Sequence, residues 1–363
     1  MVNSTPQPFV SSVGRALPPH YADQETLIAA LRDLWATKHF NIARLEDLHR
    51  SVQVAGRYLA LPVEQYAALD SFEKRNDAWI RVAQEIGAQA VMAALNEAGL
   101  TPRDVDHLFF VTVTGIATPS IDARLVNRLG MRPDVKRTPI FGLGCVAGAA
   151  GTARASDYLR AFPDEVAVLL SVELCSLTHQ REDLSIANII ASGLFGDGAA
   201  AVVLSGGNRS AQRSEGAAAL PRVMATSSVF YPDTERVMGW DIVNNGFKVI
   251  LSSQVPVLVK DRVRTDVDAF LAKHGLDRSS IKHWVAHTGG PKVLSAIEEA
   301  LELPKAALAR SWQSLSKTGN LSSASVLFVL GELLDAREAQ PGDLGLLMAM
   351  GPGFCSELVL LQW

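Results

Sequence analysis

The sequence predicts an α/β protein whose second half repeats the order of elements found in the first. Continuous apolar segments, typical of buried strands, alternate with segments of helical spacing, and they do so in both halves. The halves share little identity, which indicates duplication of an architecture rather than a short-period repeat. The 363 residues suffice for two domains or for one duplicated fold.

In the first half, helical spacing covers residues 26–58 and 76–98, and the second segment stops at Gly99, a typical helix C-cap. Strands rich in apolar and β-branched residues are expected at 106–114, 138–141, 165–172 and 199–204, and a helix is expected from Ala147 to Arg160. The polar loop 206–216 predicts a boundary between an N-terminal half, 1–215, and a C-terminal half, 216–363.

The second half follows the same scheme. Helices are expected at 263–274, 292–301 and 322–334, and strands at 281–287, 344–350 and 356–361. The last two strands flank Gly351-Pro352-Gly353, which predicts a hairpin-like turn.

Composition excludes several classes of function. Lys and Arg number 34 against 38 Asp and Glu, so the net charge is −4, and without a block of like charges we expect no nucleic-acid partner. No apolar run approaches the ~20 residues of a membrane span, and the start lacks a signal-peptide pattern, so a cytoplasmic location is expected. The three cysteines, Cys145, Cys175 and Cys355, are far apart, which argues against a metal site and a disulfide framework.

Cys145 lies in the small-residue loop 142–151, where a predicted strand gives way to a predicted helix. Free N–H groups at a helix start favour a thiolate and lower the pKa of a cysteine from ~8.5, so this position favours a nucleophile. The alternative reading is a small buried side chain, which is the interpretation for Cys175 and Cys355.

Two further residues are candidates for the same chemistry. His287 ends a predicted strand before Thr288-Gly289-Gly290-Pro291, and Asn320 opens a helix after a glycine. Taken alone, each could be structural, Asn320 as a simple N-cap. The other seven histidines have charged or helical neighbours and are interpreted as solvated: His20, His39, His49, His107, His179, His274 and His283.

Five segments, in order, resemble the type III polyketide synthases, the chalcone-synthase-like family. They are GLGCVAG at 142–148, SGLFGDGAAA at 192–201, WVAHTGGP at 284–291, GNLSSA at 319–324 and GPGF at 351–354. The resemblance spans essentially the whole chain. It implies a thiolase fold of duplicated αβαβα halves in five layers, a homodimer, acyl-CoA and malonyl-CoA as substrates, and neither a cofactor nor a metal.

The resemblance also implies site residues. It makes Cys145 the acyl-accepting nucleophile and gives His287 and Asn320 the remainder of a triad, with Phe195 as a gatekeeper. It places Val249 at a second gatekeeper position, and it places phosphate-binding cations near Arg44, Arg50 and Arg57. The substrate-binding residues that it implies are Phe195, Thr114, Thr118, Val249, Ser322, Gly289, Gly290, Lys292 and Arg50.

The expected function is therefore that of a type III polyketide synthase, which loads a starter, decarboxylates malonyl-CoA, condenses repeatedly and cyclises the product. The small side chains of Thr118 and Val249 would leave more room in the substrate pocket, which favours a long acyl starter, as in bacterial alkylpyrone and alkylresorcinol synthases. Synthases of tetrahydroxynaphthalene tend to carry a second cysteine at the Thr114 position, which argues against tetrahydroxynaphthalene as the product.

A 3-oxoacyl synthase initiating fatty-acid synthesis and a catalytically silent acyl-binding protein remain as alternatives. The starter, the number of extensions and the mode of ring closure are left open by the residues.

Overall fold

The computed structural model describes residues 6–35, 41–212 and 219–363. The helices are α1 (Gln24–Trp35), α2 (Ile42–Ser51), α3 (Phe72–Ala98), α4 (Ile121–Leu129), α5 (Ala147–Ala161), α6 (Ile186–Leu194), α7 (Val255–Ala272), α8 (Pro291–Leu301), α9 (Ala309–Thr318) and α10 (Ser325–Ala336). The strands are β1 (Phe9–Ala16), β2 (His20–Asp23), β3 (Gly56–Leu59), β4 (His107–Thr112), β5 (Lys136–Phe141), β6 (Val166–Leu174), β7 (Asp197–Ser205), β8 (Arg222–Phe230), β9 (Met238–Val243), β10 (Gly246–Leu251), β11 (His283–Ala286), β12 (Leu344–Gly351) and β13 (Cys355–Gln362).

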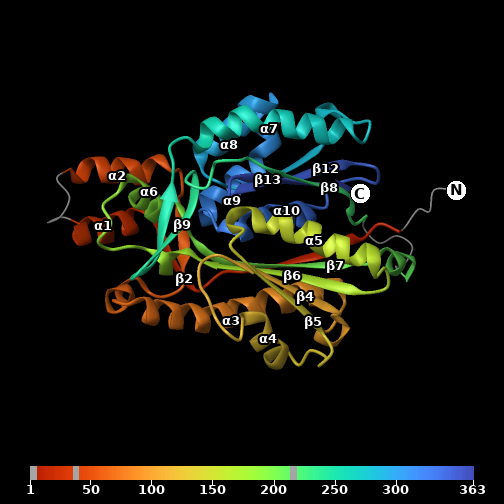
Figure 1. The fold of residues 1–363 in the computed structure, drawn as a ribbon, viewed down its shortest axis with the longest axis horizontal. Coiled ribbons are helices and arrows are strands. Elements are labelled where there is room, and N and C mark those ends of the chain that lie inside the picture. Colours follow the sequence, from red (N-terminus) through yellow and green to blue (C-terminus); the bar gives the residue numbers. More distant parts are fainter. Residues whose placement is uncertain (1–5, 36–40, 213–218) are drawn as a thin grey trace.

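The elements stack in five layers, as the resemblance implies (Figure 1). Helices α7 and α8 cover the strands of the second half, α5 and α10 lie in the middle, and α3 and α4 cover the strands of the first half. The main sheet has the order β11-β12-β13-β8-β1-β7-β6-β4-β5. Its two halves are joined between β1 and β8 by a single residue pair, Phe9 and Arg222. The expected duplicated α/β architecture is thereby confirmed.

Three hydrophobic clusters hold these layers together. One lies around α5 and α10 and includes Val146, Leu327 and Leu330, all fully buried. A second lies between α3 and β4, β6 and β7, and a third lies under α7 and α8. The middle helices contact strands from both halves, which explains why α5 is made almost wholly of small residues: close packing on two sides leaves no room for larger ones.

The sequence located most of these elements but not all. The helix predicted to stop at Gly99 does so, with Gly99 at φ +69°. The segment 26–58 was wrongly expected to form one helical surface, since it contains α1, α2 and the short strand β3. Strands β1, β2, β8, β9 and β10 and helices α4, α6 and α9 were not predicted. The predicted boundary at 215/216 falls at residues 213–218, outside the described residues.

The interpretation of the histidines as solvated was wrong in three places. His49 and His107 are only 1% and 8% exposed. The Nε2 atom of His179 is shielded from solvent and has no hydrogen-bond partner. Charged neighbours in the sequence were a poor guide to exposure, because helices, strands and turns direct adjacent side chains to different sides. His39 lies outside the described residues.

We predict that His49 makes stability depend on pH. Burial lowers the pKa of His49 to about 4. Below pH ~6.5 this imidazole therefore binds a proton in the unfolded chain but not in the folded chain. Folding stability is therefore lost as the pH falls from 6.5 toward 4, by about 2 kcal/mol between pH 7 and 5 for this group. The Tm of His49→Gln should fall less over this interval than that of the wild type. Exposed His274→Gln is the control, and an unchanged slope in His49→Gln would contradict the prediction.

Candidate functional site

Cys145 lies in a one-turn 3₁₀ segment, Gly144–Val146, directly before α5. The turn requires glycine at 144 for two reasons. Gly144 has φ +55°, and a Cβ there would lie 2.6 Å from Cγ of Pro352. The terminal Gly-Pro-Gly-Phe motif thus packs against the loop that presents Cys145.

Gly148, one turn further along, brings the start of α5 against the second half of the chain. A Cβ at this position would lie 2.3 Å from the carbonyl oxygen of Ser323. This close approach places Cys145 beside the 3₁₀ segment Ser322–Ala324, and its thiol donates to the Ser322 hydroxyl at 3.7 Å. Two of the resembling motifs are therefore in direct contact.

A small cavity of ≈ 30 Å³ is lined jointly by Cys145, His287 and Asn320. The three residues come from the start of α5, the end of β11 and the turn after α9. Phe195 and Gly289 also line the cavity, and its other walls are aliphatic or aromatic, among them Leu194, Met348 and Phe354. The structure thus brings together the three residues that the sequence predicts.

Hydrogen bonds fix the orientation of Asn320. Its backbone N–H donates to Leu194 O at 2.9 Å, and its carbonyl accepts from the N–H of Gly196 at 3.0 Å. The side-chain Oδ1 accepts the N–H of Ser322 at 2.8 Å. Because the oxygen is engaged in this way, the amide nitrogen is the group that Asn320 can offer to a ligand in the cavity.

His287 follows β11, where its N–H donates to Met348 O at 3.0 Å. Its ring is buried, and Nδ1 has no hydrogen-bond partner. Gly289 donates to the carbonyl of His287 at 2.9 Å, and Gly290, at φ +125°, caps the start of α8. This tight turn returns the chain into α8 and leaves the imidazole on the cavity wall.

Cys145 and His287 are both neutral in this arrangement. Burial raises the pKa of the Cys145 thiol to about 12, although the hydrogen bond with Ser322 opposes this, and burial lowers the pKa of His287 to about 4. The sequence predicted the opposite, a thiolate favoured by the helix start and by an imidazolium. Desolvation opposes those effects, because Cys145 and His287 are only 6% and 5% exposed.

We predict that the alkylation of Cys145 reports this neutral state. The rate of carbamidomethylation by iodoacetamide should rise about tenfold per pH unit between pH 7 and 9, because only the thiolate reacts. Mass spectrometry of the peptide that contains Cys145 measures the rate, and the less buried Cys355 provides an internal reference. A rate that is already constant below pH 7 would instead indicate a preformed thiolate–imidazolium pair.

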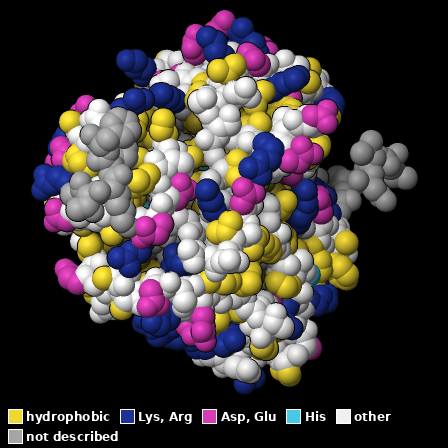
Figure 2. Space-filling view, turned by 60° about the vertical axis from the view of Figure 1, so that its left-hand side comes forward, with side chains coloured by type: hydrophobic (Ala, Val, Ile, Leu, Met, Phe, Trp, Pro, Cys, Tyr) yellow, Lys and Arg dark blue, Asp and Glu magenta, His cyan; other side chains and the backbone are white. Residues whose placement is uncertain are grey.

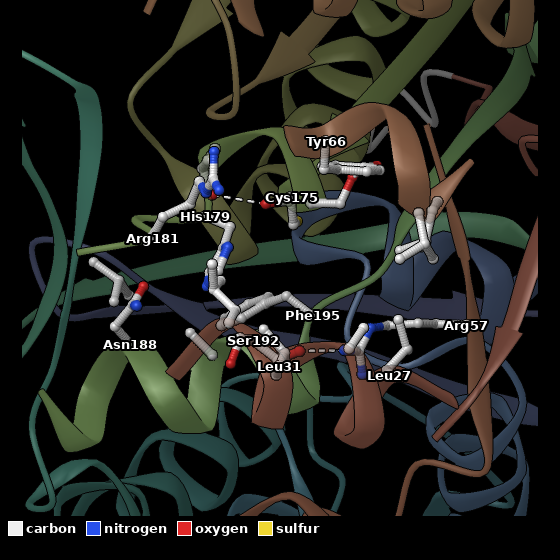
Figure 3. A pocket seen from close by; sticks show the side chains of 18 of the residues that line it. Leu27, Leu31, Arg57, Tyr66, Cys175, His179, Arg181, Asn188, Ser192 and Phe195 are labelled. Atoms are coloured by element: carbon white, nitrogen blue, oxygen red, sulfur yellow. Dashed lines mark hydrogen bonds between the residues drawn. The ribbon is translucent and has the colours of Figure 1, made fainter. Parts of the chain in front are cut away.

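A larger pocket of ≈ 240 Å³ lies beyond Phe195, which lines both spaces (Figure 3). One wall is aliphatic and comes mainly from α1, with Leu27, Leu31 and Leu34. The polar part of the lining comes from the segment that follows β6 and from α6. It contains Cys175, Ser176, Thr178, His179, Arg181, Asn188 and Ser192. Val249, the predicted second gatekeeper, also lines this pocket.

Six predicted site residues line neither space: Thr114, Thr118, Ser322, Gly290, Lys292 and Arg50. Thr114 is buried and donates to Glu173 at 2.9 Å, and Thr118 is exposed. Lys292 is exposed at the start of α8. Arg50 forms ion pairs with Glu25 at 2.9 Å and Glu46 at 3.4 Å.

The expected cationic patch is also smaller than predicted. Arg57 lies on β3, where it is buried and donates to Gln24 and to the carbonyls of Ser192 and Gly193. On the face shown in Figure 2, Lys and Arg side chains are interspersed with Asp and Glu. The part of the chain that the structure describes contains no cluster of three His, Cys, Asp or Glu side chains suited to a metal ion. It likewise contains no helix long and apolar enough to cross a membrane.

His179, Cys175 and Trp240 line the larger pocket and were not predicted as site residues. For His179 and Cys175 a signal was present, because both directly follow the buried strand β6, and residues at the carboxyl ends of parallel strands gather at one edge of a sheet. Trp240 carries no such signal, since β9 was not predicted.

Comparison with known proteins agrees with this geometry. Residues 2–208 match the N-terminal domain of chalcone and stilbene synthases, and residues 222–363 match their C-terminal domain. A 1,3,6,8-tetrahydroxynaphthalene synthase of Streptomyces peucetius is 51% identical over 354 residues, which cover 98% of this chain and 93% of the relative. A phloroglucinol synthase of Pseudomonas fluorescens is 31% identical, covering 95% of this chain and 96% of the relative.

Among solved structures, the tetrahydroxynaphthalene synthase of Streptomyces coelicolor superimposes with a TM-score of 0.90 at 30% identity, covering 98% of this chain and 99% of that one. The chain therefore belongs to the chalcone and stilbene synthase family and has its thiolase-like fold. Within that family it is a type III polyketide synthase, an acyltransferase that performs decarboxylating condensations.

Proposed function

We propose that Cys145 carries the growing acyl chain and that His287 and Asn320 activate malonyl-CoA. The observation that supports this assignment is the single cavity lined by all three residues. In loading, the Cys145 sulfur attacks the starter thioester while its proton passes to neutral His287. His287 then returns the proton to the departing CoA thiolate, so the pair ends neutral.

Decarboxylation needs donors for the enolate oxygen that develops as CO₂ leaves. The Asn320 amide is available because its oxygen already accepts from Ser322, and an N–H of His287 is the second donor. The aromatic face of Phe195 disfavours the malonyl carboxylate and so favours its departure. The carbanion attacks the Cys145 thioester, and collapse of the adduct releases the Cys145 thiolate.

We propose malonyl-CoA as extender and a polyhydroxylated aromatic as product, on the strength of the relative at 51% identity. Although Thr114 replaces the second cysteine expected of such enzymes, Cys175 places a thiol in the larger pocket. The aliphatic wall of α1 favours a second candidate, a long acyl starter giving an alkylpyrone or alkylresorcinol. The comparisons favour neither a 3-oxoacyl synthase nor a silent acyl-binding protein.

We also propose that the enzyme acts as a homodimer in the cytoplasm and without a cofactor. Ile116, in the loop after β4, and Phe141, the last residue of β5, are 46% and 51% exposed, and β4 and β5 pair at one edge of the sheet. A second copy would cover these apolar side chains. Sedimentation velocity distinguishes the dimer from a monomer.

Cys145→Ala should abolish product formation and leave the fold intact, because Ala fits the buried site without the nucleophile. Liquid chromatography with mass spectrometry, using malonyl-CoA alone and with acetyl-, hexanoyl- and dodecanoyl-CoA, measures both turnover and starter choice. Cys355→Ala is the matched control. Product from Cys145→Ala would refute the covalent mechanism, and a wild-type enzyme that ignores all acyl starters would exclude the second candidate.

Asn320→Ala should reduce CO₂ release from malonyl-CoA by about 100-fold or more, because one donor to the enolate oxygen is lost. Starter loading on Cys145, followed by intact-protein mass spectrometry, should change far less. Asn320→Asp should be at least as impaired, since it places a carboxylate beside the enolate. Equal losses in loading and decarboxylation would contradict this division of roles.

A further inference from the structure

We propose that His179 is the base that starts ring closure of the polyketide in the larger pocket. The inference rests on the proposed function above and assigns a residue to a later step. His179 lines the pocket, and its Nε2 is buried without a hydrogen-bond partner. Figure 3 shows its ring between Cys175 and Phe195, with Asn188 to one side.

The surrounding structure holds this ring in place. His179 follows the short 3₁₀ segment Cys175–Thr178, and its carbonyl accepts a hydrogen bond from Arg75 at 3.0 Å. The ring packs on Trp35 with centroids 5.6 Å apart. The position of the imidazole is therefore set by backbone and aromatic contacts, while its Nε2 is left free of protein hydrogen bonds that would compete with a ligand.

The electrostatics of the pocket suit an anionic intermediate. Among the described residues that line it, none is Asp or Glu, and two are Arg57 and Arg181. Burial, together with neighbouring cationic side chains such as Arg75 and Arg57, lowers the pKa of His179 to about 4. At neutral pH the imidazole therefore has a free lone pair in surroundings that stabilise negative charge.

The pocket is within reach of a chain tethered to Cys145. Phe195 belongs to both spaces, and Cys145 and Cys175 are close enough for a charge on one to raise the pKa of the other. An extended acyl chain that passes Phe195 therefore enters the space that His179 faces.

The proposed step is an intramolecular aldol addition. Nε2 of His179 takes a proton from a methylene group between two carbonyls, and the C–H electron pair forms an enolate. The enolate carbon attacks a ketone further along the chain, forming a C–C bond, and the ketone π electrons become an alkoxide. The imidazolium returns its proton to the alkoxide, which regenerates neutral His179, and no further reactant is needed.

Other ionisable groups of the pocket are poor candidates for this proton transfer. Burial raises the pKa of Cys175 and of Tyr66 well above their usual values, so both keep their protons. Arg57 stays charged, with a pKa lowered only to about 10. Of the described lining residues, His179 alone has a basic nitrogen whose lone pair accepts no hydrogen bond from the protein.

The test compares His179→Phe, which keeps an aromatic ring against Trp35, with His179→Gln, which keeps hydrogen bonding without basicity. Each full-length variant is incubated with malonyl-CoA alone and with hexanoyl-CoA. We measure CO₂ release and the ratio of carbocyclic products to lactones and linear acids. We expect this ratio to fall about tenfold or more in both variants, with CO₂ release within about twofold of wild type.

His107→Gln is the matched control, because His107 is buried with an unpartnered Nδ1 but lies outside the pocket. An unchanged product ratio in either folded His179 variant would overturn the proposal, as would a loss of CO₂ release parallel to the loss of rings. Failure of the proposed function is recognised separately, since the wild-type enzyme would then release no CO₂ from malonyl-CoA.

Discussion

The backbone contact between Gly148 and Ser323 controls the geometry of the site, because it decides how closely the two halves of the chain approach. Any side chain at 148 would meet the Ser323 carbonyl. Two buried hydrogen bonds hold Ser323 from the other side, to Ser171 at 2.8 Å and to Glu173. Cys145, three residues before Gly148, thereby reaches a position beside the segment that follows Asn320. The duplication matters for chemistry because each half supplies one side of this contact.

Desolvation is the second constraint, and it disfavours the charged forms of the Cys145 and His287 side chains. A cavity of ≈ 30 Å³ has room for little more than one or two water molecules. Cys145 and His287 therefore both remain neutral, and charge forms only when a substrate arrives to accept it. Such a site keeps a reactive thiolate from being exposed between turnovers, and it retains the transferred proton within the pair.

The alternation of helices and strands could be predicted from the sequence. Cys145, His287 and Asn320 could be predicted as site residues because each lies next to a predicted element within a recognisable motif. It failed where tertiary packing overrides local character. Arg57 and His49 have polar neighbours along the chain but are buried against α6. His179 precedes Gln180, Arg181 and two acidic residues, a solvated pattern in one dimension, yet its ring turns back into the pocket. The sheet order, which sets the end of β6 beside that of β4, shows why the segment after β6 reaches the site.

The larger pocket joins two walls of different chemistry, and this division bears on what the enzyme makes. The wall from β6 and α6 is polar and cationic, whereas the wall from α1 is aliphatic and belongs to the N-terminal segment rather than to the duplicated core. The polar wall stabilises a polyketone chain, because carbonyl and enolate oxygens meet donors and positive charge there. An alkyl starter is stabilised only by apolar contacts with the aliphatic wall. The aliphatic side comes mainly from Leu27, Leu31 and Leu34 of α1, so its depth can change by substitution of these leucines while Trp35 of the same helix keeps its contact with His179. Starter choice and ring closure are therefore separable properties of one pocket, the first set by packing on α1 and the second by the polar groups at the end of β6.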